Sequence, residues 1–223
     1  MDTDPTHAQP GRSRIPIARE GYRIIGVAWA LPLLFWLAGW TVLTLVGVGL
    51  AVFITSFFRD PERRTPTDPK TIVAPADGRV IKVAQVDDDR FLRGRAHMIS
   101  IFMSPLNVHV NRAPSSGRVL EVRYNSGKYF RAFADKASLD NEQNAILMED
   151  SAGRRLCFVQ IAGFVARRIV CYLHRDSEIG RGERCGMIMF GSRVDIYLPL
   201  DATTCVEIGH GTTAGETVIA RWT

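Results

Sequence analysis

An uncharged apolar run from Ile24 to Phe58 limits what this chain can fold into more than any other feature. As one helix it would measure roughly 50 Å, whereas a straight crossing of the hydrocarbon layer of a bilayer takes about 30 Å. Pro32 and Gly39 interrupt the run, and arginines lie on both of its flanks. Because basic flanks mark the cytoplasmic ends of membrane segments, both ends are expected in the cytoplasm. The run therefore predicts a membrane helical hairpin over residues 22–58 that turns near Gly39, in either a spanning or a re-entrant form.

The segments on either side of this run differ from it in composition. Residues 1–21 are polar and rich in proline and arginine, which predicts a disordered tail. A cleavable signal peptide is disfavoured, because the apolar run is too long and no small-residue cleavage site follows it. Residues 59–70 form a charged linker whose prolines cannot continue a helix. A separate domain over residues 71–223 is therefore expected, on the cytoplasmic face of the cell membrane.

Short strands punctuated by glycine dominate this domain. Strand-like runs cover Thr71–Val73, Gly78–Val86, His97–Phe102, Gly117–Tyr124, Ala145–Glu149, Arg155–Ala162 and Ile169–Tyr172. Residues Arg131 to Asn141 lack strand character, and their composition fits a helix or a loop. The predicted fold class is mainly β (α+β), a barrel-sandwich-like β domain preceded by the helical hairpin.

A repeat lies near the end of the chain. The segment from Glu178 to Gly186 matches the segment from Glu207 to Gly215 at a Glu, an Ile and three Gly positions, 29 residues apart. Two such copies would form pseudo-symmetric halves of a small barrel or sandwich. The pattern resembles the turns of biotinyl and lipoyl carrier domains, although no lysine follows Lys136 to carry such a group. A non-catalytic, membrane-tethered β domain of the carrier or adaptor type remains the alternative.

The basic balance of the chain, a net charge of +5, favours an acidic partner. Arginine supplies most of this charge in the second half of the chain, at positions 154, 155, 167, 168, 175, 181, 184 and 193. Guanidinium groups suit lipid phosphates and carboxylates as well as nucleic acid. Interleaved aromatic residues are few and an apolar hairpin is present, so the interpretation is an anionic membrane and no nucleic acid.

The four cysteines indicate neither a metal site nor a disulfide framework. None falls in a Cys-x-x-Cys pair, and no histidine stands at a metal-ligand spacing from them. Buried, reduced thiols in a cytosolic setting are expected, and no metal is predicted.

The dipeptide Gly191-Ser192 opens a stretch in which apolar residues alternate with polar ones. Val194, Ile196 and Leu198 occupy every second position, the pattern of a half-buried strand. Glycine lets the backbone bend there and leaves the carbonyl before the serine open to its hydroxyl. Taken alone, the dipeptide fits an ordinary loop-to-strand junction equally simply.

A second candidate segment places a histidine between two prolines, Pro105 and Pro114. Asn107, His109 and Asn111 alternate there and would share one face of a strand, where amides can orient an imidazole that titrates near neutrality. A surface strand edge explains the same pattern. The turn Pro75-Ala76-Asp77-Gly78 is similarly open to two interpretations, since Asp before Gly is ordinary turn chemistry.

Together these stretches resemble the phosphatidylserine decarboxylases, in their short bacterial form. The residues that carry the resemblance are Phe57-Phe58-Arg59-Asp60-Pro61-Glu62-Arg63, Ala74-Pro75-Ala76-Asp77-Gly78, Phe102-Met103-Ser104-Pro105 through Arg112-Ala113-Pro114, and Phe190-Gly191-Ser192. They occur in the family's order over nearly the whole chain beyond the tail.

The resemblance implies a carboxy-lyase that processes itself. The hydroxyl of Ser192 would attack the carbonyl of Gly191, and the resulting ester would undergo β-elimination. The chain would then consist of a large part, residues 1–191, paired with a small part, residues 192–223, that begins with a pyruvoyl group derived from Ser192. This cofactor would form a Schiff base with the amine of an aminophospholipid, phosphatidylserine, and assist its decarboxylation to phosphatidylethanolamine. A homo-oligomer is also consistent with the resemblance.

The resemblance also assigns roles to individual residues. Ser192 matches the pyruvoyl precursor, Gly191 the end of the larger chain, and Asp77 the aspartate proposed to support self-cleavage. His109 matches one histidine of the family's His-x-x-His segment, while Arg112 stands where the second histidine would be. The base for self-cleavage is therefore left open, with His109 as the candidate for both reactions. A serine hydrolase that uses Ser192 and His109 is a further alternative, but the Gly-x-Ser-x-Gly elbow is missing.

Overall fold

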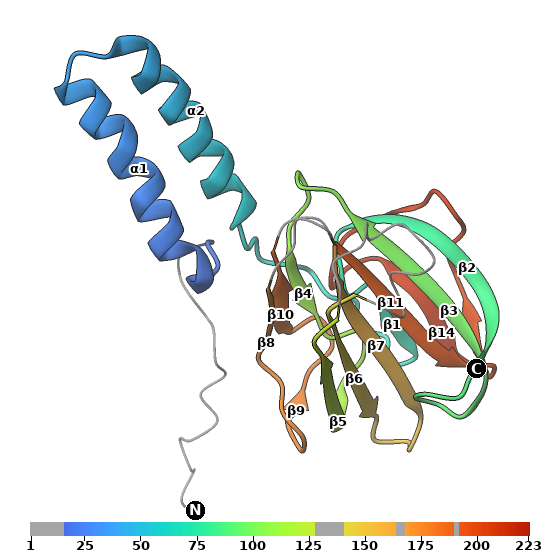
Figure 1. Cartoon of the computed structure of the whole chain (residues 1–223). Helices are drawn as coiled ribbons and strands as arrows, with labels where there is room; N and C mark the ends of the chain where they lie inside the picture. Colours follow the sequence, from blue (N-terminus) through green and yellow to red (C-terminus); the bar gives the residue numbers. More distant parts are fainter. Residues whose placement is uncertain (1–15, 128–140, 164–167, 190–191) are drawn as a thin grey trace, which may run out of the picture. The chain divides into compact units, whose positions relative to one another are not determined.

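The structure is a computed structural model that describes residues 16–127, 141–163, 168–189 and 192–223 (Figure 1). The chain divides into two compact units, residues 1–61 and residues 62–223. Each unit is described by itself. The stretch from Arg131 to Asp140, which composition left undecided, and residues 1–15 of the predicted tail lie outside the described residues. The end of the tail, predicted as disordered up to residue 21, is instead ordered, because Ile17 bridges to Arg59 and Arg19–Gly21 form a 3-10 turn.

The first unit is the expected helical hairpin. A short 3-10 turn, η1 (Arg19–Gly21), leads into α1 (Tyr22–Leu37), and α2 (Thr41–Phe57) follows after a turn in which Gly39 has φ of +78°. The two helices contact each other along their length, and the indole nitrogen of Trp29 donates a hydrogen bond to the hydroxyl of Thr55 at 3.1 Å. The hairpin and its turn at Gly39 are therefore confirmed.

The two helices of the hairpin are short. The break at Gly39 divides the apolar run into helices of 16 and 17 residues, or about 25 Å each. In the described part of the chain, neither helix is both long enough and apolar enough to cross a membrane.

In the second unit the described residues form strands, turns and loops and no helix, as the predicted mainly β fold requires. The strands are β1 (Thr71–Val73), β2 (Gly78–Asp88), β3 (Gly94–Met103), β4 (Val110–Arg112), β5 (Gly117–Asn125), β6 (Gln143–Glu149), β7 (Arg155–Ala162), β8 (Ile169–Cys171), β9 (Glu178–Ile179), β10 (Arg184–Ile188), β11 (Ser192–Pro199), β12 (Ala202–Thr204), β13 (Gly211–Thr212) and β14 (Val218–Trp222). Residues 59–70, the predicted linker, contain no helix or strand, and the boundary between the two units falls within them.

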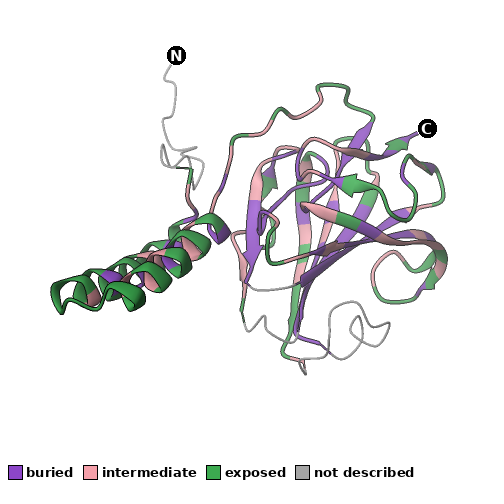
Figure 2. Ribbon diagram, turned by 90° about the horizontal axis from the view of Figure 1, so that it is seen from above, coloured by how far each residue is buried: buried purple, intermediate pink, exposed green. Residues whose placement is uncertain are grey.

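One large sheet and two small sheets make up this unit. The large sheet has the order β13-β2-β3-β11-β7-β6-β5-β9, and the small sheets have the orders β1-β14-β12 and β4-β10-β8. The large sheet curls strongly, as half of a barrel would (Figures 1 and 2). Neighbouring strands of the large sheet are antiparallel throughout.

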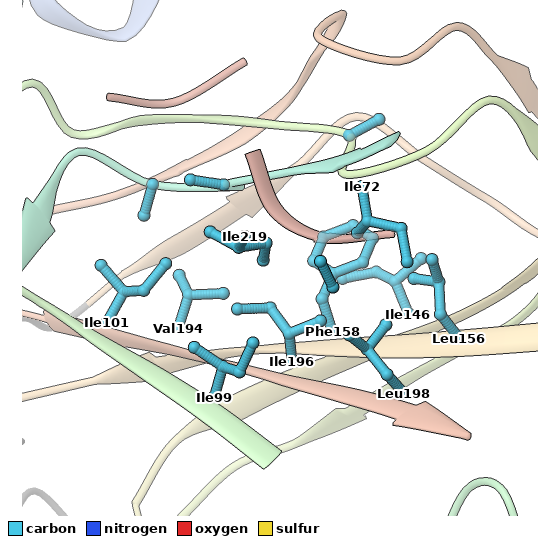
Figure 3. Close-up of a cluster of buried hydrophobic side chains, with 14 of the residues drawn as sticks. Ile72, Ile99, Ile101, Ile146, Leu156, Phe158, Val194, Ile196, Leu198 and Ile219 are labelled. Atoms are coloured by element: carbon cyan, nitrogen blue, oxygen red, sulfur yellow. The ribbon is translucent and has the colours of Figure 1, made fainter. Parts of the chain in front are cut away.

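The main core fills the concave side of the curled sheet. Ile99, Ile101, Val194 and Ile196 project from the large sheet toward Ile219 of β14, and all are fully buried (Figure 3). Packed apolar side chains from the large and small sheets thus share one core, the arrangement of a sandwich. A second cluster, which includes Met98, Cys157, Val159 and Tyr197, lies on the opposite face of the large sheet.

A pseudo-two-fold relation joins the two halves of this unit. The strand order is the same from either end when β13, β2, β3 and β11 are exchanged with β9, β5, β6 and β7. Gly78 pairs with Thr212, and Gly117 pairs with Ile179 in the same way. The predicted duplication is therefore present.

The register of the duplication differs from the predicted one. Thr212 and Ile179 are 33 residues apart, as are Gly215 and Gly182, which have φ of +77° and +78°. The sequence identities at a spacing of 29 were misleading, because hydrogen bonding and left-handed backbone conformation, not the Glu-Ile-Gly identities, determine which residues are equivalent.

Strand β11 is buried on both faces, whereas its alternating pattern predicted a half-buried strand. Arg193, Asp195 and Tyr197 are as inaccessible as the apolar residues between them. The guanidinium of Arg193 makes a bidentate ion pair with Asp195, with both N–O distances at 2.6 Å. This pairing makes burial of the two charges tolerable.

The cysteines agree only in part with the expectation of buried thiols. Cys157 and Cys185 are buried, Cys171 is half-buried and Cys205 is exposed. Burial raises the pKa of the Cys157 and Cys185 thiols well above the usual value, so both stay protonated.

Candidate active site

Ser192 is the first residue of β11, in the middle of the curled sheet. β11 pairs with β3 and β7, which places Met103 and Ala162 directly opposite Ser192. The serine is fully buried, and no group within the described residues hydrogen-bonds its hydroxyl. Because a buried hydroxyl without a partner costs free energy, this serine is a candidate for a chemical role. Gly191, the predicted other side of the cleaved bond, lies outside the described residues.

The other predicted segments converge on the same end of the central strands. Asp77 directly precedes β2. This strand pairs with β3, and the pairing begins with Arg79 opposite Phe102. The backbone N–H of Arg112 in β4 donates to the carbonyl of Pro75 at 2.9 Å. The stretches around Asp77, Met103, Arg112 and Ser192 are therefore brought together, although they are distant in sequence.

His109 is fully buried directly before β4, and its carbonyl accepts a hydrogen bond from the N–H of Ile188 in β10. Its ring nitrogen Nδ1 lies 2.9 Å from the carbonyl oxygen of Asn107. Since a carbonyl can only accept, Nδ1 carries the proton and Nε2 is the basic nitrogen of the neutral ring. This tautomer leaves a base on the far side of the imidazole.

The predicted strand face with two amides beside His109 is corrected by the structure. Strand β4 begins only at Val110, and the residues from Val108 to Arg112 are all buried. The side-chain oxygen of Asn107 accepts from the backbone N–H and the hydroxyl of Ser104, at 2.9 and 2.8 Å, and closes a turn. The main-chain carbonyl of Asn107, and not its amide, orients the histidine.

Two partners hold the carboxylate of Asp77. Nitrogen Nη2 of Arg63 lies 3.0 and 2.9 Å from its two carboxylate oxygens, and the N–H of Ala214 donates to Oδ1 at 2.7 Å. In the other pseudo-symmetric half, Arg181 N–H donates to the hydroxyl of Ser116 in the same way. The backbone contact is thus a turn closure shared by both halves, and the ion pair with Arg63 is what distinguishes Asp77.

Arg112 does not have the surroundings of a base. Its side chain is buried, its Nη1 donates to the carbonyl of Gly182 at 2.9 Å, and it packs against Gly215. These are the two equivalent glycines with positive φ. Arg112 therefore ties the two glycine turns together, a structural role that histidine could not fill in the same way.

The arginines predicted to form a lipid-binding surface are largely occupied. Arg154 and Arg155 pair with Asp150 and Glu149, and Arg193 is buried. Arg181 donates to the carbonyls of three linker and strand residues, and Arg184 pairs with Glu62; Arg167 lies outside the described residues. Most of these charges stabilise the unit, whereas Arg168 and Arg175 are exposed and take part in none of these contacts.

Sequence patterns gave no indication of a buried amide chain beside the serine. Asn144, Gln160 and Asn111 come from β6, β7 and β4 and hydrogen-bond one another in series. Asn111 belonged to the predicted site, but the other two occur within apolar strands and carry no motif. A buried polar residue at a core position of a strand is the signal that would have found them.

Comparison with known proteins bears directly on this site. The sequence profile of the family "phosphatidylserine decarboxylase" matches residues 50–220. The chain is 47% identical over 204 residues to the phosphatidylserine decarboxylase proenzyme of Syntrophotalea carbinolica, covering 92% of this chain and 95% of the relative. It is 49% identical to that of Citrifermentans bemidjiense and 45% identical to that of Ruegeria pomeroyi, covering 92% of this chain in each case and 95% and 94% of the relatives.

The buried serine at a strand start and these similarities define a self-processing lyase. The chain belongs to the phosphatidylserine decarboxylase family. Members of this family are carboxy-lyases made as proenzymes, and they carry a serine-derived pyruvoyl group. The resemblance noted in the sequence is thereby confirmed for the family and the cofactor, and the carrier and hydrolase alternatives are set aside.

Proposed function

We propose that this chain cleaves itself between Gly191 and Ser192 and then decarboxylates phosphatidylserine to phosphatidylethanolamine. The observation that carries this assignment is the buried hydroxyl of Ser192 at the start of a strand held from both sides by β3 and β7. The residue that becomes the new chain end is thus part of the rigid core. After cleavage the paired strands would keep residues 192–223 bound to the larger chain.

Self-cleavage would proceed in steps that consume one water and release one ammonia. The hydroxyl oxygen of Ser192 attacks the carbonyl of Gly191, and the peptide bond becomes an ester. Removal of the proton on Cα of Ser192 then expels the Gly191 carboxylate. Addition of water and loss of ammonia leave the pyruvoyl group.

His109 is the base that fits these steps best. Its Nδ1–H is fixed by the carbonyl of Asn107, which makes Nε2 the basic nitrogen of the neutral ring. Asp77 has a supporting role, since its carboxylate is already engaged by Arg63 and by the backbone of Ala214. Arg112 is excluded as a base by its permanent charge and by its bond to Gly182.

The surroundings of Ser192 fit the group that would form there. A pyruvoyl group has a methyl where the serine has its hydroxymethyl group, and this methyl would lie between the apolar side chains of Met103 and Ala162. Once formed, the group supplies a carbonyl that bonds to the substrate amine and draws electrons from the bond to the departing carboxylate. His109, in its protonated form, would return a proton to the product carbon.

We further propose that the hairpin anchors the chain on the cytoplasmic face of the membrane in a re-entrant arrangement. Both helices expose large apolar side chains over most of their surface, among them Val42, which is 73% exposed. An exposed apolar surface of this extent on a hairpin marks contact with lipid or with another protein. A lipid substrate favours the first of these.

Intact-mass spectrometry tests the proposed function. Purified protein is expected to contain a chain ending at Gly191 and a chain starting at former Ser192, the latter lighter by one ammonia than a serine-started peptide. Ser192→Ala is expected to remain one chain without activity. Active wild-type protein of full-length mass would refute the proposal.

A further inference from the structure

Three buried amides form a directed chain across the core face of the sheet. Nδ2 of Asn144 donates to Oε1 of Gln160 at 3.1 Å, and Nε2 of Gln160 donates to Oδ1 of Asn111 at 2.9 Å. All three side chains are at least 98% inaccessible. Each amide therefore polarises the next in the same direction, in surroundings where hydrogen bonds are strong.

The last amide of this series, that of Asn111, donates to a weak acceptor. Nδ2 of Asn111 points to the thioether sulfur of Met103, at 3.7 Å. Amide donors normally pair with oxygen, and a thioether replaces little of the bond to water lost on burial. Reversing the amides would place a carbonyl oxygen against the sulfur, so the direction from Asn144 to Asn111 is the favourable one. Among the residues that the structure describes, the polarised N–H of Asn111 thus has only this weak acceptor.

The Nδ2 donor of Asn111 contacts the residue that lies directly opposite Ser192. Met103 is directly opposite Ser192 in the antiparallel pair β3–β11, and both belong to the core face of the sheet. Side chains in such positions start from Cβ atoms about 4.5–5.5 Å apart. Gln160 is opposite Val194, one position further along the same face. The series of amides therefore ends on Met103, the residue directly opposite Ser192 on the core face.

We propose that Asn111 Nδ2 donates a hydrogen bond to the oxyanion that forms when the hydroxyl of Ser192 attacks the carbonyl before it in self-cleavage. Gln160 and Asn144 are positioning residues that orient and polarise this donor. A preorganised donor of this kind acts only when charge appears, which is why a weak partner in the resting state is suitable. This inference rests on the proposed role of Ser192.

The test follows self-cleavage of newly made full-length chain on gels. Asn111→Leu, which removes the donor at similar size, is expected to slow cleavage by about 10²- to 10³-fold. Gln160→Met, which keeps Asn111 but removes its polarising bond, is expected to slow cleavage by a smaller factor. Gln143→Met is the matched control, because Gln143 is a buried amide in β6 that belongs to the opposite face of the sheet.

The outcomes separate this inference from the proposed function. Wild-type protein that is not cut before Ser192 removes the proposed function itself. Normal cutting of wild type, together with Asn111→Leu and Gln160→Met cleaving within about two-fold of Gln143→Met, overturns the role of Asn111 alone. Thermal unfolding in the uncleavable Ser192→Ala background shows whether each variant is folded. If Asn111→Leu is not, Gln160→Met decides, and an unchanged rate in that variant overturns the inference.

Discussion

Nitrogen Nη2 of Arg63 lies 3.0 and 2.9 Å from the two carboxylate oxygens of Asp77. Both side chains are largely buried, at 10% and 14% exposure. The linker is fixed on either side of this pair as well, by Glu62 with Arg184 and by the N–H of Arg64 with the carboxylate of Glu216. The segment that follows the hairpin therefore supplies the charge that holds the aspartate proposed to assist maturation.

Arg63→Met is expected to slow self-cleavage and to lower the free energy of unfolding by roughly 2–3 kcal/mol, because a nearly buried carboxylate loses its partner. Arg64→Met is the matched control, since it removes an adjacent charge while the Arg64 contact to Glu216 uses only the backbone. Arg63→Lys should restore part of the rate. Cleavage on gels and urea unfolding in the Ser192→Ala background measure both effects. Equal cleavage rates in Arg63→Met and Arg64→Met would contradict the expected role.

The same contact determines how the anchor should be tested. A chain that starts at Glu62 lacks the hairpin and keeps Arg63, whereas a chain that starts at Arg64 lacks both. Both are expected to lose most of their association with anionic vesicles, and only the first is expected to cleave itself at a nearly normal rate. Vesicle flotation in low and high salt gives the first quantity, because salt screens residual binding by exposed arginines. Retention of the shorter chains on vesicles in high salt would show that the hairpin is not the main anchor.

Local patterns were sufficient to predict most strands of the second unit. Thr71–Val73 and Arg155–Ala162 are strands with the predicted bounds, since alternating or β-branched residues between glycine turns favour extended backbone wherever the chain lies. Burial on the second face of β11 was not predictable in this way. It depends on which strands become its neighbours, and β3 and β7 are distant in sequence.

The candidate site was predictable as a set of residues but not as a set of contacts. Ser192, His109 and Asp77 were predicted from the family resemblance, and the structure brings their segments to the same end of strands β2, β3 and β11. The partners of Asp77 and His109 were missed. Arg63 belongs to a linker without secondary structure, and a backbone carbonyl such as that of Asn107 leaves no trace in sequence.

His109→Ala is expected to slow both self-cleavage and turnover, each by roughly 10²- to 10⁴-fold, because one imidazole serves as base and later as acid. Arg112→Met should instead lower stability, since it loses the bond to Gly182, while the fraction that folds should mature and turn over. Cleavage on gels and lipid product from the matured fraction give the two rates. Normal cleavage with lost turnover in His109→Ala would confine His109 to decarboxylation.

Tyr197 is expected to make the stability of the uncleaved chain depend on pH in alkali. Burial, and next the charge of Asp195, raise the pKa of Tyr197 from 10.0 to about 12, while its hydroxyl oxygen accepts a hydrogen bond from Arg90 at 2.9 Å. Because the pKa is higher in the folded state than in the unfolded state, the contribution to stability is complete below pH 10. It is lost as pH rises toward about 12, and amounts to roughly 2–3 kcal/mol.

Urea unfolding of Ser192→Ala from pH 9 to pH 12, beside the same chain with Tyr197→Phe, measures this contribution. The phenylalanine variant is expected to be less stable at pH 9, because it lacks the bond to Arg90, and to lose less stability above pH 10. The two curves should therefore approach each other as pH rises, since only the tyrosine must be deprotonated on unfolding. Parallel curves over this range would mean that Tyr197 ionises as readily in the folded chain as in the unfolded one.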